Sequence, residues 1–205
     1  MRLVLASGSR ARLALLRAAG IDPLVRVSGV DEDALGSTLC DASPAELVTA
    51  LASAKAEAVA ADVAAEHPDA AIVGCDSMLH IGGELVGKPG DPDIALRRWQ
   101  AMAGSTGELI TGHAVVRLDG GAVMATASGA QATLIRFSTP SAEEIAAYVS
   151  TGEPLQVAGG FTLEGRGGWF IDGIDGDPSS VIGISLPLTR RLLTEVGISV
   201  VSLWS

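Results

Sequence analysis

A carboxylate and a lysine flank a predicted turn in the stretch AAIVGCDSMLHIGGELVGKP, residues 70–89. The stretch begins with an apolar run typical of a buried strand, and Asp76 follows that run. Gly82-Gly83 predicts a tight hairpin, after which Lys88 lies between a glycine and a proline. A carboxylate and an ammonium around one cleft suit metal-assisted phosphoryl or pyrophosphoryl chemistry. The alternative is a strand end with a turn-forming Asp76 and a solvated Lys88.

The N-terminal segment predicts a strand, a small polar loop and a helix. Leu3-Val4-Leu5 is the strand, Ser7-Gly8-Ser9 lies in the loop, and the helix spans about residues 10–19. Such a loop directs backbone N–H groups and hydroxyls toward an anion. Arg10 and Arg12 oppose the helix dipole in its first turn, which favours an anion there. The alternative is an ordinary N-cap serine, and the sequence contains no P-loop.

Two further segments carry charges that could serve a phosphate or metal site. Val30-Asp31-Glu32-Asp33 follows a second predicted strand at Val25–Val27, and on an extended segment one or two of these carboxylates would face a cleft. A solvated acidic loop is the alternative. Lys55 lies among alanines on a helix that begins with a Ser43–Glu46 capping box and ends near Glu66. Lys55 could extend to water or reach a phosphate.

The remaining elements are helices, long hairpin strands and a glycine-dense stretch. His113 is expected to be a strand residue with a satisfied ring. Glu164, in the glycine-dense stretch 158–168, could accept hydrogen bonds from a base edge. The Asp-Gly run 172–178 lacks the register of a calcium loop. We predict helices near 92–102, 140–150 and 187–196, and strands at 108–118, 122–137, 169–171 and 198–204. This order predicts a mixed α/β sheet rather than a Rossmann fold.

Composition limits the classes of partner. The chain has 205 residues, 48% of them apolar, and a net charge of −10 from 14 basic and 24 acidic residues. A general nucleic-acid surface is therefore not expected, because such surfaces need clustered cations. The sequence contains no membrane-length apolar run. Cys40 and Cys75 have no zinc-site spacing, and we expect reduced thiols and a cytoplasmic location.

Taken together, these motifs resemble the Maf family of nucleoside triphosphate pyrophosphatases, once described as septum-formation inhibitors. The resemblance covers residues 3–193 and depends on the joint order and spacing of motifs that are individually weak. The motifs are Ser7-Gly8-Ser9 with Arg12, Val30-Asp31-Glu32, Lys55, Gly74-Cys75-Asp76-Ser77, Gly87-Lys88-Pro89 and Gly173-Ile174-Asp175-Gly176-Asp177.

The resemblance implies a fold and an activity. The fold is an elongated mixed-sheet α/β domain, shared with inosine triphosphate pyrophosphatases, that spans residues 1–205 and has a nucleotide cleft between two lobes. The activity is hydrolysis of a nucleoside triphosphate to the monophosphate and pyrophosphate with Mg²⁺ or Mn²⁺. House-cleaning of modified or non-canonical nucleotides and a link to cell-division arrest are further implications. Apart from the resemblance, an elongated fold with apolar helix faces makes a homodimer reasonable.

Residue roles carry over by position. Asp76 resembles the catalytic proton acceptor and, with Glu32, a metal-side carboxylate. The residues that resemble triphosphate contacts are Ser7, Ser9, Arg12, Lys55 and Lys88.

The chain departs from the family pattern at positions that bear on base selection. Ala11 replaces the first arginine of a common pair, Ser77 replaces a threonine, and Glu164 replaces a glutamine of the dTTP/UTP-type group. Gln156-Val157-Ala158-Gly159 stands where Asp-Lys-Ala-Gly is common, and Gly107 lies near a frequent histidine position. The triphosphate groups are retained, so these departures leave the preferred base open.

Two other functions remain open on the sequence. A nucleotide-binding regulatory module would keep the cleft but hydrolyse weakly or not at all. A nucleotidyltransferase would use the same metal and cations to form a bond. The combination of an acid, several cations and a phosphate loop favours the hydrolase. The sequence does not distinguish a general base from a metal ligand at Asp76.

Overall fold

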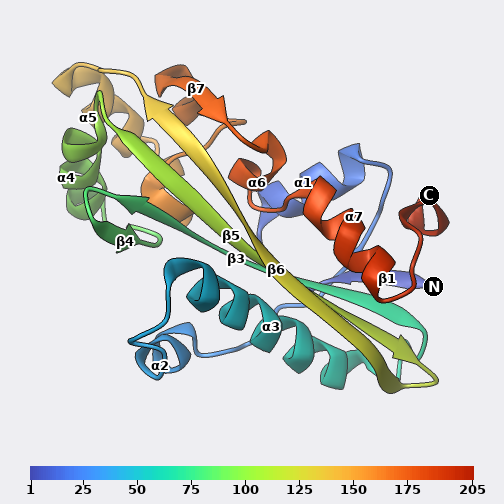
Figure 1. Cartoon of the computed structure of the whole chain (residues 1–205). Helices are drawn as coiled ribbons and strands as arrows, with labels where there is room; N and C mark the ends of the chain where they lie inside the picture. Colours follow the sequence, from blue (N-terminus) through green and yellow to red (C-terminus); the bar gives the residue numbers. More distant parts are fainter. The chain divides into compact units, whose positions relative to one another are not determined.

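The computed structural model describes residues 1–205 and has a mixed α/β fold, as predicted (Figure 1). One sheet has the strand order β2-β1-β3-β5-β6-β7, and β4 pairs with β3. The strands are β1 (Arg2–Leu5), β2 (Leu24–Val25), β3 (Ala70–Ile81), β4 (Glu84–Val86), β5 (Thr106–Asp119), β6 (Ala122–Phe137) and β7 (Ile171–Asp175). The helices are α1 (Arg10–Ala18), α2 (Glu32–Ser37), α3 (Pro44–Val63), α4 (Pro92–Met102), α5 (Ala142–Ser150), α6 (Pro178–Ile182) and α7 (Leu186–Glu195). Short 3₁₀ helices are η1 (Glu153–Gln156), η2 (Ala158–Gly160), η3 (Arg166–Phe170) and η4 (Val200–Leu203).

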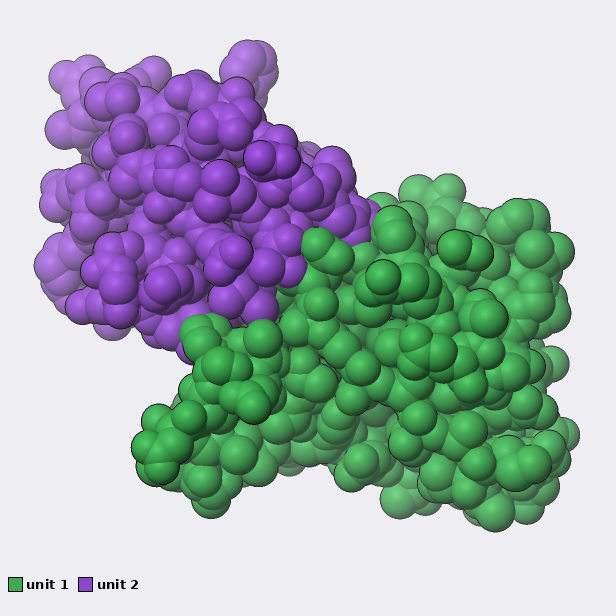
Figure 2. Space-filling view, in the orientation of Figure 1, with its two compact units in different colours: residues 1–76, 111–131, 183–205 green, residues 77–110, 132–182 purple.

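The chain divides into two compact units, coloured separately in Figure 2. Unit 1 comprises residues 1–76, 111–131 and 183–205, and unit 2 comprises residues 77–110 and 132–182. Three long strands, β3, β5 and β6, contribute residues to both units. That the whole chain is one functional domain stays a prediction.

In unit 1, helices cover both faces of the sheet. β1 pairs in parallel with β2 and with β3, with Leu5 opposite Val73. Apolar residues of α3 pack on one face, and apolar residues of α1 and α7 pack on the other. Strands buried on both faces read as continuous apolar runs rather than as an alternation, which is what the sequence of β1 and the start of β3 shows.

The helix α3 begins where its sequence predicts. Ser43 Oγ accepts a hydrogen bond from the Glu46 backbone N–H, and the Glu46 carboxylate accepts one from the Ser43 N–H. This reciprocal capping box satisfies two of the N–H groups that a helix start leaves unpaired. The alanines of α3 let its backbone approach the sheet closely, and Ala52 and Ala56 are fully buried there.

Unit 2 is built around Trp99 of α4. Its indole makes edge-to-face contacts with Phe137, Tyr148 and Phe170, at centroid separations of 5.4–5.9 Å. The indole Nε1–H donates a hydrogen bond of 2.7 Å to the carbonyl of Gly160. Trp99 therefore anchors the glycine-dense stretch to the core of unit 2, since a buried Trp N–H needs such an acceptor.

Several local predictions are wrong. Asp76 is not at a strand end, because β3 continues through it to Ile81. Of the predicted extended segment at residues 31–33, only Asp31 is extended, because Glu32 and Asp33 begin α2. Asp31 is the N-cap of α2, and its carboxylate accepts a hydrogen bond from the Ala34 N–H at 2.9 Å. The predicted strand at 198–204 contains the 3₁₀ helix η4, and the strand predicted at 169–171 begins only at Ile171. Short apolar runs do not distinguish a strand from a turn of helix, so tertiary packing decided these cases.

No helix of the protein combines the length and the apolar character that crossing a membrane would require.

Candidate functional site

A lysine and two carboxylates form a compact cluster in unit 1. Lys55 Nζ lies 2.6 Å from Asp76 Oδ1 and 2.8 Å from Glu32 Oε1. Lys55 and Asp76 are each only 7% exposed, whereas the Glu32 side chain is about half exposed, at 47%. The cluster therefore has a buried ion pair on one side and a solvent-facing carboxylate on the other. A buried charge pair of this kind needs close geometry to offset its desolvation.

The close approach of α3 to β3 brings Lys55 to Asp76. Gly74 lies two residues before Asp76, and a Cβ atom built on it would meet the Ala52 carbonyl oxygen at 2.3 Å and the Ala56 N at 3.0 Å. Only glycine fits between these backbones. Lys55, which directly precedes Ala56, is thereby held over the strand that carries Asp76.

Arg12 joins the N-terminal loop to the strand that carries Asp76. Its Nη1 group donates hydrogen bonds to Ser7 Oγ at 3.0 Å and to the Cys75 carbonyl at 2.8 Å. Its Nε–H donates to the Gly183 carbonyl at 2.7 Å. The guanidinium is therefore fixed beside the residue that precedes Asp76, as a planar, multiply bonded cation.

The N-terminus of α1 has an ordinary serine cap, which was the alternative to an anion-binding loop. Ser9 is the N-cap, and its Oγ accepts from the Arg12 backbone N–H at 3.3 Å. Ser7 Oγ also accepts from the Ser9 N–H at 3.2 Å. The first turn contains no acidic residue that would complement the helix dipole. An anion at this positive end of the helix dipole stays a prediction.

Cys75 is an inert neighbour of the cluster rather than a nucleophile. Complete burial raises the pKa of its thiol to about 11; the Asp76 charge adds to this rise, and the charges of Arg12 and Lys55 oppose it. Because the thiolate is the reactive form, Cys75 stays unreactive near neutral pH.

The structure brings some of the predicted site residues together and places others elsewhere. Lys55, Asp76 and Glu32 are in direct contact, and Arg12 contacts Ser7. Among the residues predicted to select the base, Ala11 is half-buried in α1, and Ser77 directly follows Asp76 in β3. Lys88, which follows β4, and Glu164 are exposed in unit 2. Their roles stay predictions.

Sequence reasoning missed the segment Gly183-Ile184-Ser185, which precedes α7. Gly183 accepts the Arg12 hydrogen bond, and its φ of +116° lies where other residues are strained. A Cβ there would also come within 3.0 Å of Arg12 Nε. The signal in the sequence was a glycine and a serine directly before an apolar helix, which by itself predicts only a helix cap.

The carboxylates suit a divalent cation that shares its coordination with a substrate. No group of three or more His, Cys, Asp or Glu side chains converges on one point. Mg²⁺ is commonly held by one or two carboxylates together with substrate phosphates and water, and it prefers oxygen donors. Asp76 and Glu32, which both contact the Lys55 ammonium, would provide such a donor set.

Two surface depressions are lined by other residues than those of this cluster. One of about 570 Å³ in unit 1 is lined by C-terminal residues that include Arg190 and Trp204. Another of about 730 Å³ in unit 2 is lined by residues that include Tyr148 and Trp169. The residues that line these two depressions include none of the predicted site residues. The chemistry of the cluster, rather than cavity size, identifies the candidate site.

Comparison with known proteins agrees with the resemblance. The family described as Maf-like protein matches residues 2–196. A protein of Saccharopolyspora erythraea named nucleoside triphosphate pyrophosphatase is 68% identical over 205 residues, covering 100% of this chain and 97% of that protein. Proteins with the same name from Nocardia farcinica and Rhodococcus erythropolis are 60% and 58% identical, each covering at least 98% of this chain and 96% of the relative.

Proposed function

Because the chain belongs to the Maf-like protein family, we propose that it is a nucleoside triphosphate pyrophosphatase. Water attacks the α-phosphorus, the bond between the α-phosphorus and the bridging oxygen breaks, and the products are the nucleoside monophosphate and pyrophosphate. The full-length relatives at 58–68% identity that carry this name support the enzyme class.

The observation that carries the proposal is the contact of one buried ammonium with two carboxylates. Lys55 Nζ lies within 2.8 Å of both Asp76 and Glu32, and Arg12 is bonded to the carbonyl of the residue before Asp76. Such an arrangement places fixed positive charge beside a potential proton acceptor. Phosphoryl transfer depends mainly on positioning and on this kind of charge stabilisation.

The cations must overcome the charge of the rest of the protein. The chain has a net charge of −10, and a nucleoside triphosphate is itself strongly anionic. We assign Arg12, Lys55 and Lys88, with the hydroxyls of Ser7 and Ser9 and the N-terminus of α1, to binding the triphosphate. The rigid bonding of Arg12 lowers the entropy that is lost when it binds phosphate.

Asp76 is assigned to accept the proton of the attacking water, with Glu32 completing the carboxylate pair. Asp76 and Glu32 are also the residues that would hold Mg²⁺ or Mn²⁺, which when bound would act as a Lewis acid and offset charge on the phosphates. The Asp76→Asn variant distinguishes the two roles of Asp76. The Asn amide can still ligate a metal weakly, but it cannot accept a proton.

The decisive variant is Asp76→Asn. We expect pyrophosphate release to fall by about 10²- to 10⁴-fold, the range for loss of an acid–base group, while the fold measured by circular dichroism is retained. Asp62→Asn is the matched control, since that side chain is 70% exposed on α3. Near-native kcat in Asp76→Asn with added Mg²⁺ or Mn²⁺ would refute the assignment.

A substrate panel distinguishes the finer proposals. Pyrophosphate release should be measured with dTTP, UTP, CTP, 7-methyl-GTP and inosine triphosphate, with product analysis in the absence of an acceptor. Preference for a modified base would support a house-cleaning role. Tight binding without turnover would instead indicate a regulatory module, and incorporation of the nucleotide into an acceptor would indicate a nucleotidyltransferase. Ala11, Ser77 and Glu164 are the positions to exchange once a preference is known.

The cellular setting is proposed as cytoplasmic. The proposed link to cell-division arrest rests only on the resemblance to a family once described as septum-formation inhibitors. A homodimer is proposed as well, and sedimentation equilibrium measures it directly: a mass of about one chain, 20.8 kDa, would contradict it.

A further inference from the structure

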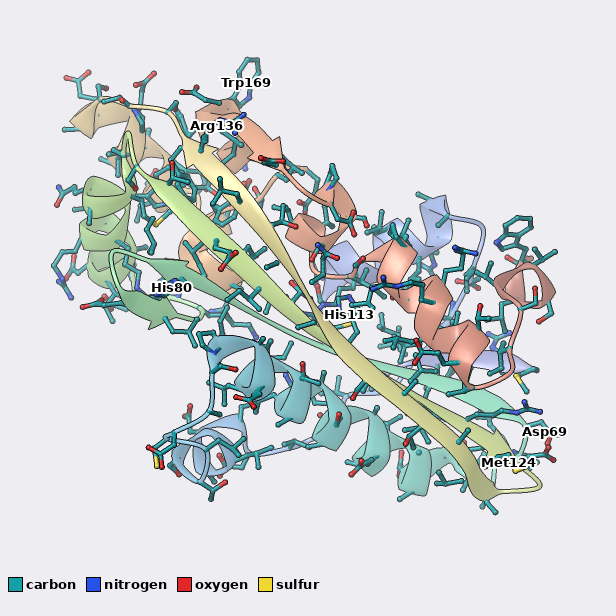
Figure 3. All side chains as sticks on the ribbon, viewed as in Figure 1. Asp69, His80, His113, Met124, Arg136 and Trp169 are labelled. Atoms are coloured by element: carbon teal, nitrogen blue, oxygen red, sulfur yellow. The ribbon has the colours of Figure 1, made fainter.

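His113 is a buried side chain that the proposed reaction does not use. His113, which is labelled in Figure 3, lies on β5 and has no exposed surface. Nδ1 is 3.0 Å from the Thr111 carbonyl, and Nε2 is 2.7 Å from the Ser185 backbone N. A backbone N–H can only donate, so Nε2 is the acceptor and the ring proton is on Nδ1. The partners therefore fix a neutral ring in one tautomer.

The backbone that His113 binds is the same short segment that holds Arg12. Ser185 is the N-cap of α7, and two residues earlier the Gly183 carbonyl accepts the Arg12 Nε–H at 2.7 Å. Between them, the side chain of Ile184 is fully buried in the core of unit 1. The segment is thus fixed at Ser185 by His113, at Ile184 by packing, and at Gly183 by Arg12.

We propose that His113 is a positioning residue for triphosphate binding, which acts through Ser185 and Gly183 to set the orientation of the Arg12 guanidinium. This inference rests on the proposed function, because it takes Arg12 as a phosphate contact. The hydrogen bond to Ser185 places the Gly183 carbonyl, and the carbonyl fixes Nε. The guanidinium is planar, so fixing Nε also fixes the plane in which the Nη groups point.

The alternative is that His113 only stabilises the fold. A buried polar side chain with satisfied partners contributes to stability wherever it lies. Substitution of a residue that only stabilises the fold changes the free energy of unfolding. Substitution of a positioning residue also changes the orientation of Arg12 and the KM for the triphosphate.

A matched pair of variants separates the two bonds of the ring. The amide of Asn can occupy the position of Nδ1, and the amide of Gln can reach the position of Nε2. His113→Asn therefore keeps a donor for Thr111 and loses the acceptor for Ser185, whereas His113→Gln retains an acceptor for Ser185. We expect His113→Asn to raise KM for the triphosphate about tenfold, as small misplacements of a binding group do, with a much smaller change in kcat. His113→Gln should restore KM toward the wild-type value.

A second readout does not depend on activity. The Arg12 Nε–H proton, identified by its loss in Arg12→Lys, should exchange with solvent faster in His113→Asn than in His113→Gln. If the wild-type protein released no pyrophosphate from any triphosphate, the proposed function would fail, and this exchange measurement would still decide the positioning role. Equal KM values and equal Arg12 exchange in the two variants would overturn the inference.

Gly183→Ala tests the same coupling if the His113 variants fail to fold. It leaves His113 unchanged, but its Cβ would lie 3.0 Å from Arg12 Nε at a φ of +116°. A higher KM and faster Arg12 exchange are expected, and wild-type values for both would contradict the proposal.

Discussion

At the scale of single residues, the site depends on how one ammonium is shared. Lys55 contacts a buried carboxylate, Asp76, and a half-exposed one, Glu32. Removing the lysine would leave Asp76 buried without its cation, which costs more than the pair itself contributes. Lys55 therefore has a structural role in addition to the triphosphate-binding role that we propose for it.

We predict that Lys55→Met lowers the free energy of unfolding by about 3 kcal/mol or more, because it breaks a buried ion pair. The double variant Lys55→Met/Asp76→Asn should recover part of that loss, since the unpaired charge is gone. Chemical denaturation measures both, with Glu57→Gln, exposed on the same helix, as the control. A single variant as stable as the wild type would show that the pair contributes nothing.

The raised pKa of the Cys75 thiol predicts that stability depends on pH in the alkaline range. Burial raises its pKa from 9.0 to about 11, so the folded protein holds this proton more tightly than the unfolded chain does. Stability from this group is present below pH 9 and is lost as pH rises through about 11. The free energy of unfolding of the wild type should therefore decline between these values relative to that of Cys75→Ala. Parallel curves would contradict the shift.

At the scale of elements, the site is made by the packing of α3 on β3. Gly74 removes the Cβ that would separate them, and the alanines of α3 face it. A helix that lies this close to a strand can place a lysine side chain over the strand without exposing it. The same contact thus determines both stability and the distance between Lys55 and Asp76.

We predict that Gly74→Ala moves α3 away from β3, because a Cβ would meet the Ala52 carbonyl oxygen at 2.3 Å. The free energy of unfolding should fall by about 1–3 kcal/mol, the usual cost of overpacking, and pyrophosphate release should fall with it. Gly129→Ala is the control, since its nearest side-chain atom, Leu188 Cδ1, would be 3.8 Å away. Equal stability and activity in the two variants would refute the packing argument.

At the scale of the whole molecule, the two units use different means of holding their loops. In unit 1, Arg12 links the N-terminal loop, β3 and the segment before α7. In unit 2, Glu153 holds the glycine-dense stretch by accepting from the Thr162 hydroxyl at 2.5 Å and from the Gly167 N–H at 3.1 Å. Burial alone would raise the pKa of Glu153, but these hydrogen bonds outweigh it and lower the pKa.

This lowered pKa predicts that unit 2 is sensitive to acid. A carboxyl group with a depressed pKa stabilises the fold above its unfolded pKa, near 4.5, and that stability is lost as pH falls below it. Hydrogen exchange of residues 153–168 should increase as pH is lowered through this range. Glu153→Gln should remove the pH-dependent part, and Glu143→Gln, exposed on α5, should not. Unchanged pH dependence in Glu153→Gln would contradict the assignment.

The sequence by itself determined the features that depend on local chemistry. The capping box at Ser43 and Glu46, the Gly82-Gly83 hairpin and the two long strands β5 and β6 follow from turn residues and from apolar pattern, which act over a few residues. The order of weak motifs also sufficed to identify the family, because their joint spacing is specific.

Only the tertiary structure decided which charges meet and through which backbone. Lys55 and Asp76 are 21 residues apart, and Arg12 and Gly183 are 171 apart. Contacts over such separations depend on how helices pack on the sheet, and the sequence pattern carries no direct record of that packing. The same limit explains why residues 32–33 and 198–204 were assigned to the wrong kind of structure. Their short apolar and acidic patterns fit several local conformations, and packing selected one.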